Sequence, residues 1–489
     1  MMEQGKPIGE SRRLLGTAFV SAVLAVLILL NVIFGALAAR FGWYFYSAER
    51  YEHTIGDASY ALFEELPAGK SVRVLFCMPE EEMLGDPIYS LVLNTLRQLE
   101  ERHSFIEIEF KNIYLNPAEV KPFRTRTLAN GETVEYPITD RSVIFVSGED
   151  ASDFCVESLE SFFVLDSEQV ITAYNGEEVA LSRLSFVLRD SHPIASFTIG
   201  HGENFGELYA FYNTLVAAGY DVTYHDLTEP IPTGTELLVI ANPRWDLDRG
   251  AEGSGVEAEL DRLDDFLAGG GDLFVSLDPY VKSDLLNLRA FLAARGLVAT
   301  QEVIRDLENS ITYDGFTLVT EMATSELSTR ISERIGAYSS SRAVVKEASS
   351  LVCTEVEGWL AEPILSSSPT SETYKNGVKT GEAARYTVLA ASHSEAEDAT
   401  VILTSSVFLL ANDAMNSGTY INRDVVLASL EDASGMTAPV GCRLLPIESR
   451  RIEDLTMGVA RLYAAALTLG IPLVIAAVGL VICVRRRRK

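Results

Sequence analysis

Residues 194–226 have the sequence IASFTIGHGENFGELYAFYNTLVAAGYDVTYHD, and this stretch decides the expected fold. Its first part, Ile194–Ile199, is an apolar run with the length of a buried strand. Phe205–Ala218 has apolar residues at helical spacing, and Gly219 stands where a helix commonly ends. Tyr220–His225 then predicts a second strand. A strand, a helix and a strand in this order predict a βαβ unit with two parallel strands.

The same alternation continues downstream of this unit. Glu236–Ala241 predicts a buried strand, Val256–Leu267 a helix with one apolar face, and Asp272–Leu277 a further strand. Three consecutive glycines at 269–271 end the helix. Together these elements predict a doubly wound, Rossmann-like α/β module over residues 191–300.

Another α/β domain is predicted upstream of the module, over residues 40–190. Val72–Met78 and Ile106–Phe110 have strand patterns, and Ile88–Arg102 between them has helical spacing. Ser142–Val146 supplies another strand. Because strands and helices alternate, the sheet of this domain is expected to be mostly parallel, with covering helices.

The region after the module is harder to interpret. Residues 301–461 contain several polar, turn-rich stretches and predict a mixed strand and loop region that completes the folded part of the chain. Within it, Arg385–Ala391 and Ala399–Leu403 are apolar runs that could add strands to the module.

Two apolar stretches bracket the chain, Leu14–Ala39 and Leu462–Val484, and neither contains Asp, Glu, Lys or Arg. A helix needs about 20 apolar residues to cross a bilayer, and both stretches exceed that length. They predict one transmembrane helix at each end. For the first, a cleaved signal peptide is the alternative, because Ala36-Leu37-Ala38 is similar to a cleavage site. The length of the apolar core favours an uncleaved anchor.

The charges beside these stretches predict the orientation of the chain. Residues 485–489 are all basic, and short basic flanks stay in the cytoplasm. The tail 1–13 has a weak bias of the same sign. Both termini are therefore expected in the cytoplasm and residues 40–461 outside it, in a two-pass protein of the plasma membrane with the lipid bilayer as a partner.

Composition excludes some partners and cofactors. The formal net charge of −29 disfavours binding to nucleic acid or to anionic lipid. An even number of cysteines between the two apolar stretches permits disulfides without showing them. These cysteines are Cys77, Cys155, Cys353 and Cys442. Because they are widely spaced and no Cys-x-x-Cys occurs, we expect neither a disulfide scaffold nor a metal site, and no cofactor is expected.

Several of these motifs together resemble the GldG-type auxiliary component of ABC transporters. The most specific is the turn Gly200-His201-Gly202-Glu203 in its βαβ context, followed by FLAGGGDLFVSLDP at 266–279. Asn116-Pro117 and Asn422-Arg423-Asp424 are also similar to the family. The resemblance covers most of the chain, including both apolar stretches. Residues 298–385 match little, and Ser405-Ser406-Val407 stands where a more acidic turn is usual.

The resemblance implies a non-catalytic accessory subunit that works beside an ABC permease and a cytoplasmic ATPase, and some members are associated with gliding motility. It does not identify the substrate. The sequence agrees that ATP hydrolysis belongs to a partner, because Gly69-Lys70-Ser71 lacks the first glycine of a phosphate-binding loop; Glu64 stands in its place. An exported hydrolase and a surface glycan-binding or adhesion module are the alternatives from other classes.

The turn after the strand Ile194–Ile199 is the candidate site. His201, Glu203 and Asn204 lie where open α/β sheets bind ligands, and they are candidate contacts for a partner or a ligand. In the structural alternative, His201 and Glu203 cap the following helix and hydrogen-bond to nearby loops. A hydrolase would need a nucleophile, and the candidate Ser276 at the end of a strand lacks the flanking glycines of a nucleophile elbow.

Overall fold

Five parallel strands form the half of the largest sheet that corresponds to the predicted module. Their order is β10 (Asp221–Asp226), β9 (Ile194–Ile199), β11 (Thr235–Ala241), β12 (Asp272–Ser276) and β21 (Ala399–Thr404). The order is that of flavodoxin-like doubly wound sheets. The chain therefore reverses its direction of travel across the sheet between β9 and β11. In such sheets this switch point, at the carboxyl ends of the strands, is the expected ligand site.

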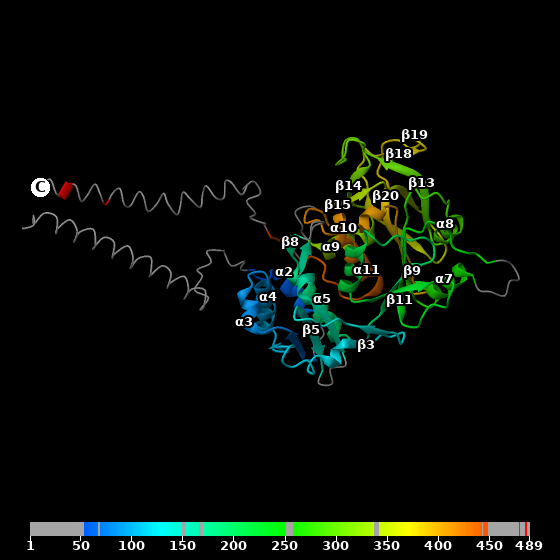
Figure 1. Cartoon of the computed structure of the whole chain (residues 1–489). Coiled ribbons are helices and arrows are strands. Elements are labelled where there is room, and N and C mark those ends of the chain that lie inside the picture. Colours follow the sequence, from blue (N-terminus) through cyan, green and yellow to red (C-terminus); the bar gives the residue numbers. More distant parts are fainter. Residues whose placement is uncertain are drawn as a thin grey trace, which may run out of the picture. The chain divides into compact units, whose positions relative to one another are not determined.

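The computed structural model contains this sheet in a unit that begins at Thr54 (Figure 1). It describes residues 53–447 except for 67–68, 149–152, 166–169, 251–257, 337–341 and 443, and also residues 479, 485 and 486.

Helices cover both faces of the parallel half. On one face, α6 (Tyr209–Ala218) and α11 (Asn422–Ser434) pack on a core that includes Phe197 and Phe274. On the other face, the apolar side of α7 (Glu259–Ala268) packs with α8 (Leu286–Ala293) against the strands. The two cores contain alternate residues of the same strands, as expected for a sheet that is buried on both sides.

Beyond β21 the same sheet becomes antiparallel. β20 (Thr387–Ser394) is joined to β21 by a four-residue turn, 395–398, which is too short for a crossover and forces the antiparallel pairing. The remaining strands of the sheet are β13 (Leu297–Arg305), β14 (Thr317–Met322), β15 (Arg342–Lys346), β16 (Ser349–Cys353), β17 (Leu360–Ser366), β18 (Glu372–Lys375) and β19 (Val378–Lys379), with α9 (Glu326–Ile335) packed on β17.

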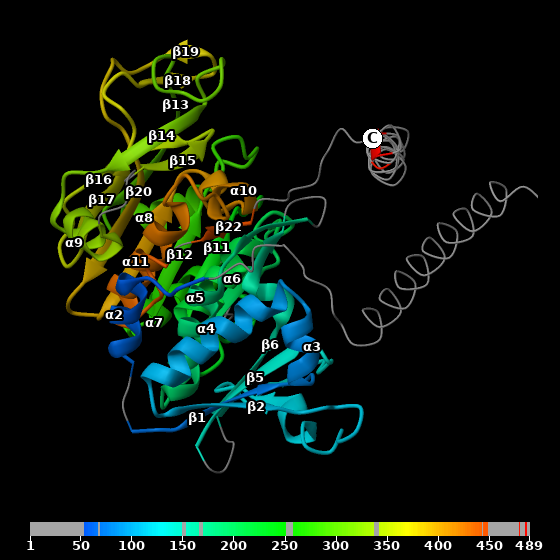
Figure 2. The same cartoon turned by 90° about the vertical axis from the view of Figure 1, so that its left-hand side faces the viewer.

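The upstream sheet has the order β2 (Ile106–Phe110), β1 (Val72–Phe76), β5 (Ser142–Ser147) and β6 (Asp153–Ser158). Only β1 and β2, which are connected through α4 (Tyr89–Arg102), pair in parallel. The connection from β2 to β5 contains no α-helix, so β5 enters antiparallel to β1. The prediction of mostly parallel sheets is therefore wrong, and the structure is mixed α/β (Figure 2).

Shorter elements complete the described fold. They are α2 (Asp57–Glu64), α3 (Glu80–Gly85), η1 (Lys121–Arg124), β3 (Thr125–Thr127), β4 (Thr133–Glu135), η2 (Leu159–Phe162), β7 (Phe163–Leu165), β8 (Ile171–Tyr174), η3 (Val407–Leu410), α10 (Asn412–Met415) and β22 (Leu445–Pro446).

One helix, α5 (Gly176–Leu188), joins the upstream sheet to the module. It contacts β5 and β6 on one side and α6 on the other, and nearly all of its residues are buried. A second connection is the ion pair between Arg126 and Asp221, whose side chains are only 8% and 11% exposed. These contacts link the two α/β parts of the unit through buried surfaces.

The prediction of flanking transmembrane helices is corrected by the structure. Among the described residues, no helix is long and apolar enough to span a bilayer. The architecture of a two-pass membrane protein and the plasma-membrane localisation derived from it are therefore not supported. The stretches on which they were based, 14–39 and all of 462–484 except Gly479, lie outside the described residues.

Replacing Gly219 should destabilise the fold. Gly219 ends α6 with φ of 102°, and a Cβ atom there would meet the guanidinium of Arg189, which donates a 2.8 Å hydrogen bond to Thr437 O. We expect Gly219→Ala to lower the free energy of unfolding by roughly 2 kcal/mol, measured by urea denaturation.

Gly435→Ala is the matched control for this substitution. Gly435 also ends a helix in the left-handed region, with φ of 68°, but an added Cβ there meets nothing within 4 Å. We expect a loss of about 1 kcal/mol from the backbone conformation alone. Equal losses for the two variants would contradict a role for the Arg189 contact.

Candidate functional site

The predicted turn places His201 at the switch point between β9 and β11. The residue is 6% exposed, and its imidazole lies between two carboxylates. His201 Nε2 is 3.0 Å from Glu259 Oε2, and Nδ1 is 3.5 Å from Glu203 Oε1. The close contact with the Glu203 carboxylate and the negative charge of Glu259 outweigh burial and raise the pKa of His201 to about 9. The ring is therefore an imidazolium held inside the fold at neutral pH.

Backbone hydrogen bonds close the crevice around this imidazolium. The carbonyl of His201 accepts from Arg244 N at 2.8 Å and from Trp245 N at 3.0 Å, which joins the loops after β9 and β11. Glu259 Oε2 also accepts from Asp248 N at 2.7 Å. His201 Nε2 and the two carboxylates are thus engaged with one another and with backbone N–H groups, whereas His201 Nδ1 has no hydrogen-bond partner among the described residues.

The three candidate residues of the turn have different surroundings. His201 and Glu203 lie together, because Glu203 Oε2 accepts from His201 N at 2.8 Å, whereas Asn204 is exposed. The expected capping of the next helix is wrong, because Asn412 Oδ1 accepts from Ala210 N of α6 at 2.7 Å. The expected hydrogen bonding to a nearby loop is confirmed for His201, whose carbonyl accepts from the loop after β11. Contact of the turn with a partner or ligand stays a prediction.

Ser276, the candidate nucleophile, has an exposed fraction of 0% at the end of β12. Its hydroxyl is enclosed by the sheet and its covering elements, so no substrate can approach it in this structure. Among the described residues, no group of three His, Cys, Asp or Glu side chains could hold a metal ion.

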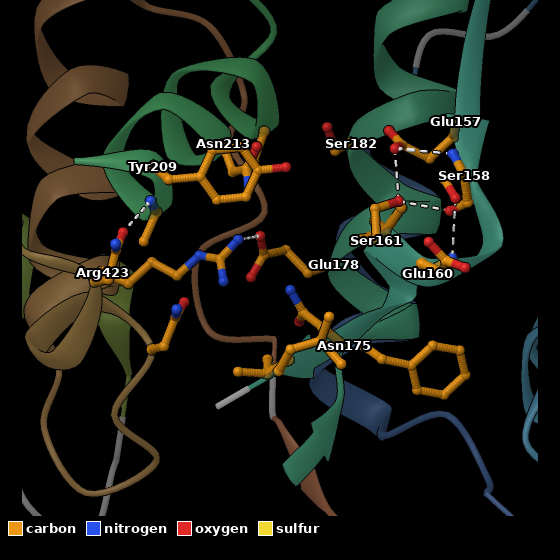
Figure 3. A pocket seen from close by; sticks show the side chains of 18 of the residues that line it. Glu157, Ser158, Glu160, Ser161, Asn175, Glu178, Ser182, Tyr209, Asn213 and Arg423 are labelled. Carbon is orange, nitrogen blue, oxygen red and sulfur yellow. Dashed lines mark hydrogen bonds and ion pairs between the residues drawn. The ribbon is translucent and has the colours of Figure 1, made fainter. Parts of the chain in front are cut away.

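A larger cavity lies between the two α/β parts, with a volume of about 850 Å³. Its walls come from α5 on one side and from α6, α10 and α11 on the other (Figure 3). Residues from η2, β7 and β8 complete the lining. The volume is within the usual range for small-molecule sites, which often lie where two parts of a protein meet.

An ion pair crosses this cavity from one wall to the other. Figure 3 shows Arg423 of α11 extending to Glu178 of α5, with which it forms a salt bridge. The two side chains are 15% and 4% exposed. Burial raises the pKa of Glu178, and the charge of Arg423 opposes that shift. Arg423 therefore stabilises the charged form of the buried Glu178 carboxylate, and removing either side chain would leave the other without its ion pair.

Two polar atoms beside the pair have no hydrogen-bond partner among the residues that the structure describes. They are Arg423 Nε, a donor, and Asn175 Oδ1, an acceptor, and Asn175 is only 4% exposed. Buried polar groups are normally paired, because an unpaired one costs about 1–3 kcal/mol. Both residues line the cavity. A bound molecule that offers one acceptor and one donor would satisfy both atoms.

Two of the other charged side chains in the lining compensate each other, whereas Asp413 of α10 has no ion pair among the described residues. Arg183 of α5 forms a 2.6 Å ion pair with Glu157 of β6, and both side chains are 14% exposed. Uncharged carboxamides add to the lining on the opposite wall, from Asn213, Asn412 and Asn416. The arrangement suits a polar ligand that exchanges hydrogen bonds rather than a strongly charged one.

Reasoning from sequence missed this cavity. Arg423 belongs to the motif Asn422-Arg423-Asp424, which contributed to the family resemblance, and that motif was the one available signal. Its partner Glu178 is 245 positions away in the chain, so no local pattern connects the two residues.

Comparisons with known proteins add little. No protein-family model and no curated protein matches the chain. Among solved structures, the N-terminal domain of mmIFT52 is 15% identical, with 49% of this chain and 97% of that chain covered and a TM-score of 0.37. A ThuA-like protein from Bacteroides uniformis is 11% identical, with 52% and 97% covered and a TM-score of 0.32. Likenesses this weak carry no argument about function.

Removing the guanidinium of Arg423 should be costly. Arg423→Met leaves the Glu178 carboxylate buried without its partner, and we expect a loss of about 3 kcal/mol in the free energy of unfolding by urea denaturation. Adding Glu178→Gln should restore much of that loss, because the buried charge is removed as well.

The control for Arg423→Met is Arg330→Met. Arg330 pairs with Asp432 at 3.0 Å, but the two side chains are 55% and 30% exposed. A surface pair contributes about 1 kcal/mol or less. If the two single variants lost equal stability, the cavity pair would be no more important than a surface pair.

The His201 imidazolium predicts a dependence of stability on pH. Its pKa is raised from 6.5 to about 9, so its contribution is complete below pH 6.5 and is lost as pH rises through about 9. We expect the wild type to lose up to about 3 kcal/mol more than His201→Gln between pH 6.5 and 9.5, from urea titrations at each pH. His225→Gln, at a half-buried histidine of β10 that contacts the Glu229 carbonyl, is the control and should follow the wild type. Parallel curves for wild type and His201→Gln would refute the assignment.

Proposed function

We propose that this protein is a non-catalytic binding subunit of an ABC-type transport system. It would bind a polar solute in the cavity between α5 and α11, while a separate permease and ATPase carry out transport. The observation that carries the proposal is the cavity itself, in which Asn175 Oδ1 and Arg423 Nε are buried atoms without a hydrogen-bond partner in the described part of the chain.

The burial of His201, Glu259 and Ser276 at the switch point supports a binding role over catalysis. His201 and Glu259 bind each other there, and Ser276 is fully buried. Binding proteins often hold ligands in a cleft between two α/β parts. Here such a cleft has two compensated ion pairs and several carboxamides in its walls.

The partners are proposed from the GldG resemblance and from the site together. A protein that binds a solute but does not convert it needs other subunits to transport that solute. If genes for an ABC permease and an ATPase lie beside the gene for this chain, tagged full-length chain expressed with both should recover them on affinity purification. Recovery of the chain alone under conditions that keep the permease and ATPase together would contradict the transport role.

Blocking the cavity should abolish solute binding without breaking this complex. Asn213 lines the cavity from α6, and Asn213→Trp would fill part of its volume. In a thermal-shift screen of sugars, amino acids and short peptides, a solute at 100 times its Kd should stabilise the wild type by about 2.7 kcal/mol. The same solute should leave the unfolding midpoint of Asn213→Trp unchanged.

Asn116→Trp is the control for Asn213→Trp, because Asn116 is exposed in a loop and does not line the cavity. It should respond to the solute as the wild type does. A shift of equal size in Asn213→Trp would show that the solute binds elsewhere. Both variants should still recover the permease and the ATPase.

A further inference from the structure

A second pocket, with a volume of about 300 Å³, lies on the α6 face of the sheet at its β10 edge. Its lining is almost entirely aromatic: Phe197, Phe205, Leu208, Tyr209, Tyr212 and Tyr224. Phe197 and Leu208 are buried, whereas Tyr209 and Tyr224 are 67% and 54% exposed. The pocket therefore has a buried floor and walls that reach the solvent.

The parallel pairing of β9 and β10 builds the floor and one wall. Tyr224 and Phe197 occupy partner positions in the two strands, and their ring centroids are 5.8 Å apart. Phe205 meets both rings edge to face, at 5.4 Å from Phe197 and 5.5 Å from Tyr224. These three rings hold one another in a fixed arrangement.

The first turn of α6 supplies the other wall. Tyr209 and Tyr212 are three positions apart on the helix, and their rings are nearly parallel, at an angle of 4° and a centroid distance of 6.4 Å. The N–H groups at this helix end are already engaged, Ala210 with Asn412 Oδ1 and Tyr212 with Leu208 O. This limits the positive charge that the helix end presents to the pocket.

The electrostatics of the lining favour a cation. An aromatic ring carries negative potential on its face and attracts ammonium and guanidinium groups. This chain uses that interaction elsewhere, for example with Arg295 at 3.6 Å from the ring centre of Phe291. Among the described residues, no Lys or Arg of the chain lies over the rings of the pocket, and the lining contains no charged side chain.

Carboxylates in the neighbourhood strengthen this preference. Asp226 is two residues beyond Tyr224 on β10 and therefore lies on the same face of the sheet. Hydrogen bonds from the backbone and hydroxyl of Thr228 hold its pKa below the usual value. The basic residue Arg183 near Tyr212 is already neutralised by Glu157 at 2.6 Å. The net charge of the whole chain is −29.

We propose that this aromatic pocket binds a small free quaternary ammonium compound of the choline type through cation–π contacts. A trimethylammonium group has no N–H donors, so it loses no hydrogen bonds when rings replace water around it. This explains why a cation site can have a lining without a carboxylate. The inference concerns a different pocket from the solute cavity and does not rest on the proposed transport role.

Choline and its uncharged isostere 3,3-dimethylbutan-1-ol provide the test, because they share a shape and differ in charge. Isothermal titration of the full-length chain should show saturable choline binding, with the isostere at least about tenfold weaker. Tyr224→Leu should weaken choline binding at least about tenfold, whereas Tyr224→Phe should keep it within about threefold, because the ring remains. Unfolding curves of each variant confirm that the chain is folded.

Tyr280→Leu is the matched control, because Tyr280 is also 54% exposed but does not line the pocket. It should bind choline like the wild type. Equal binding of choline and the isostere would identify an ordinary apolar pocket and overturn the inference. No saturable choline binding, or unchanged binding in Tyr224→Leu, would overturn it too. Vesicles of phosphatidylcholine distinguish the two sources of a trimethylammonium group, free choline and a lipid headgroup. Binding to the vesicles without saturable binding of choline would also overturn the assignment to a free solute.

Discussion

The burial of α5 between two sheets is the constraint on which the rest of the structure depends. A helix that faces β5 and β6 on one side and α6 on the other must be apolar around most of its circumference. The few polar residues that it does carry therefore need partners inside the protein. Glu178 forms an ion pair with Arg423, and Arg183 forms one with Glu157. The same packing that joins the two α/β parts thus produces a cavity with two internal ion pairs in its walls.

The regular elements could be predicted from the sequence wherever their causes are local. Ile194–Ile199 is a strand with the expected bounds, because its apolar run and the following glycine act over a few residues. The helix before Gly219 begins at Tyr209 rather than at Phe205, because Phe205 packs against Phe197 and Tyr224 instead of joining the first turn. The prediction of parallel strands in the upstream sheet was wrong. The direction of a strand depends on whether the connection before it contains a helix, and the segment from β2 to β5 has only short elements.

The candidate site could be located from the sequence but not understood from it. His201 was correctly placed after a strand at the switch point, yet its surroundings come from Glu259, 58 positions later. A glycine-flanked histidine beside a glutamate has the same local pattern whether it faces a substrate or an internal carboxylate. The solute cavity could not be predicted from the sequence for a related reason. Its walls meet only when α11 returns to α5, and Asn412 caps a helix 202 positions earlier in the chain.

The two pockets differ in the charged side chains of their linings, and Tyr209 lines both of them. In the larger cavity, both arginines of the lining are paired with carboxylates, so hydrogen-bond geometry would decide which of the proposed solutes binds there. In the aromatic pocket the lining has no charge, so the ring faces and the acidic field of the chain remain uncompensated. Because Tyr209 is 67% exposed, it can change rotamer without disturbing the buried core on either side. Tyr209 is the one described side chain that belongs to both linings, so a substitution there would change the shape of both pockets.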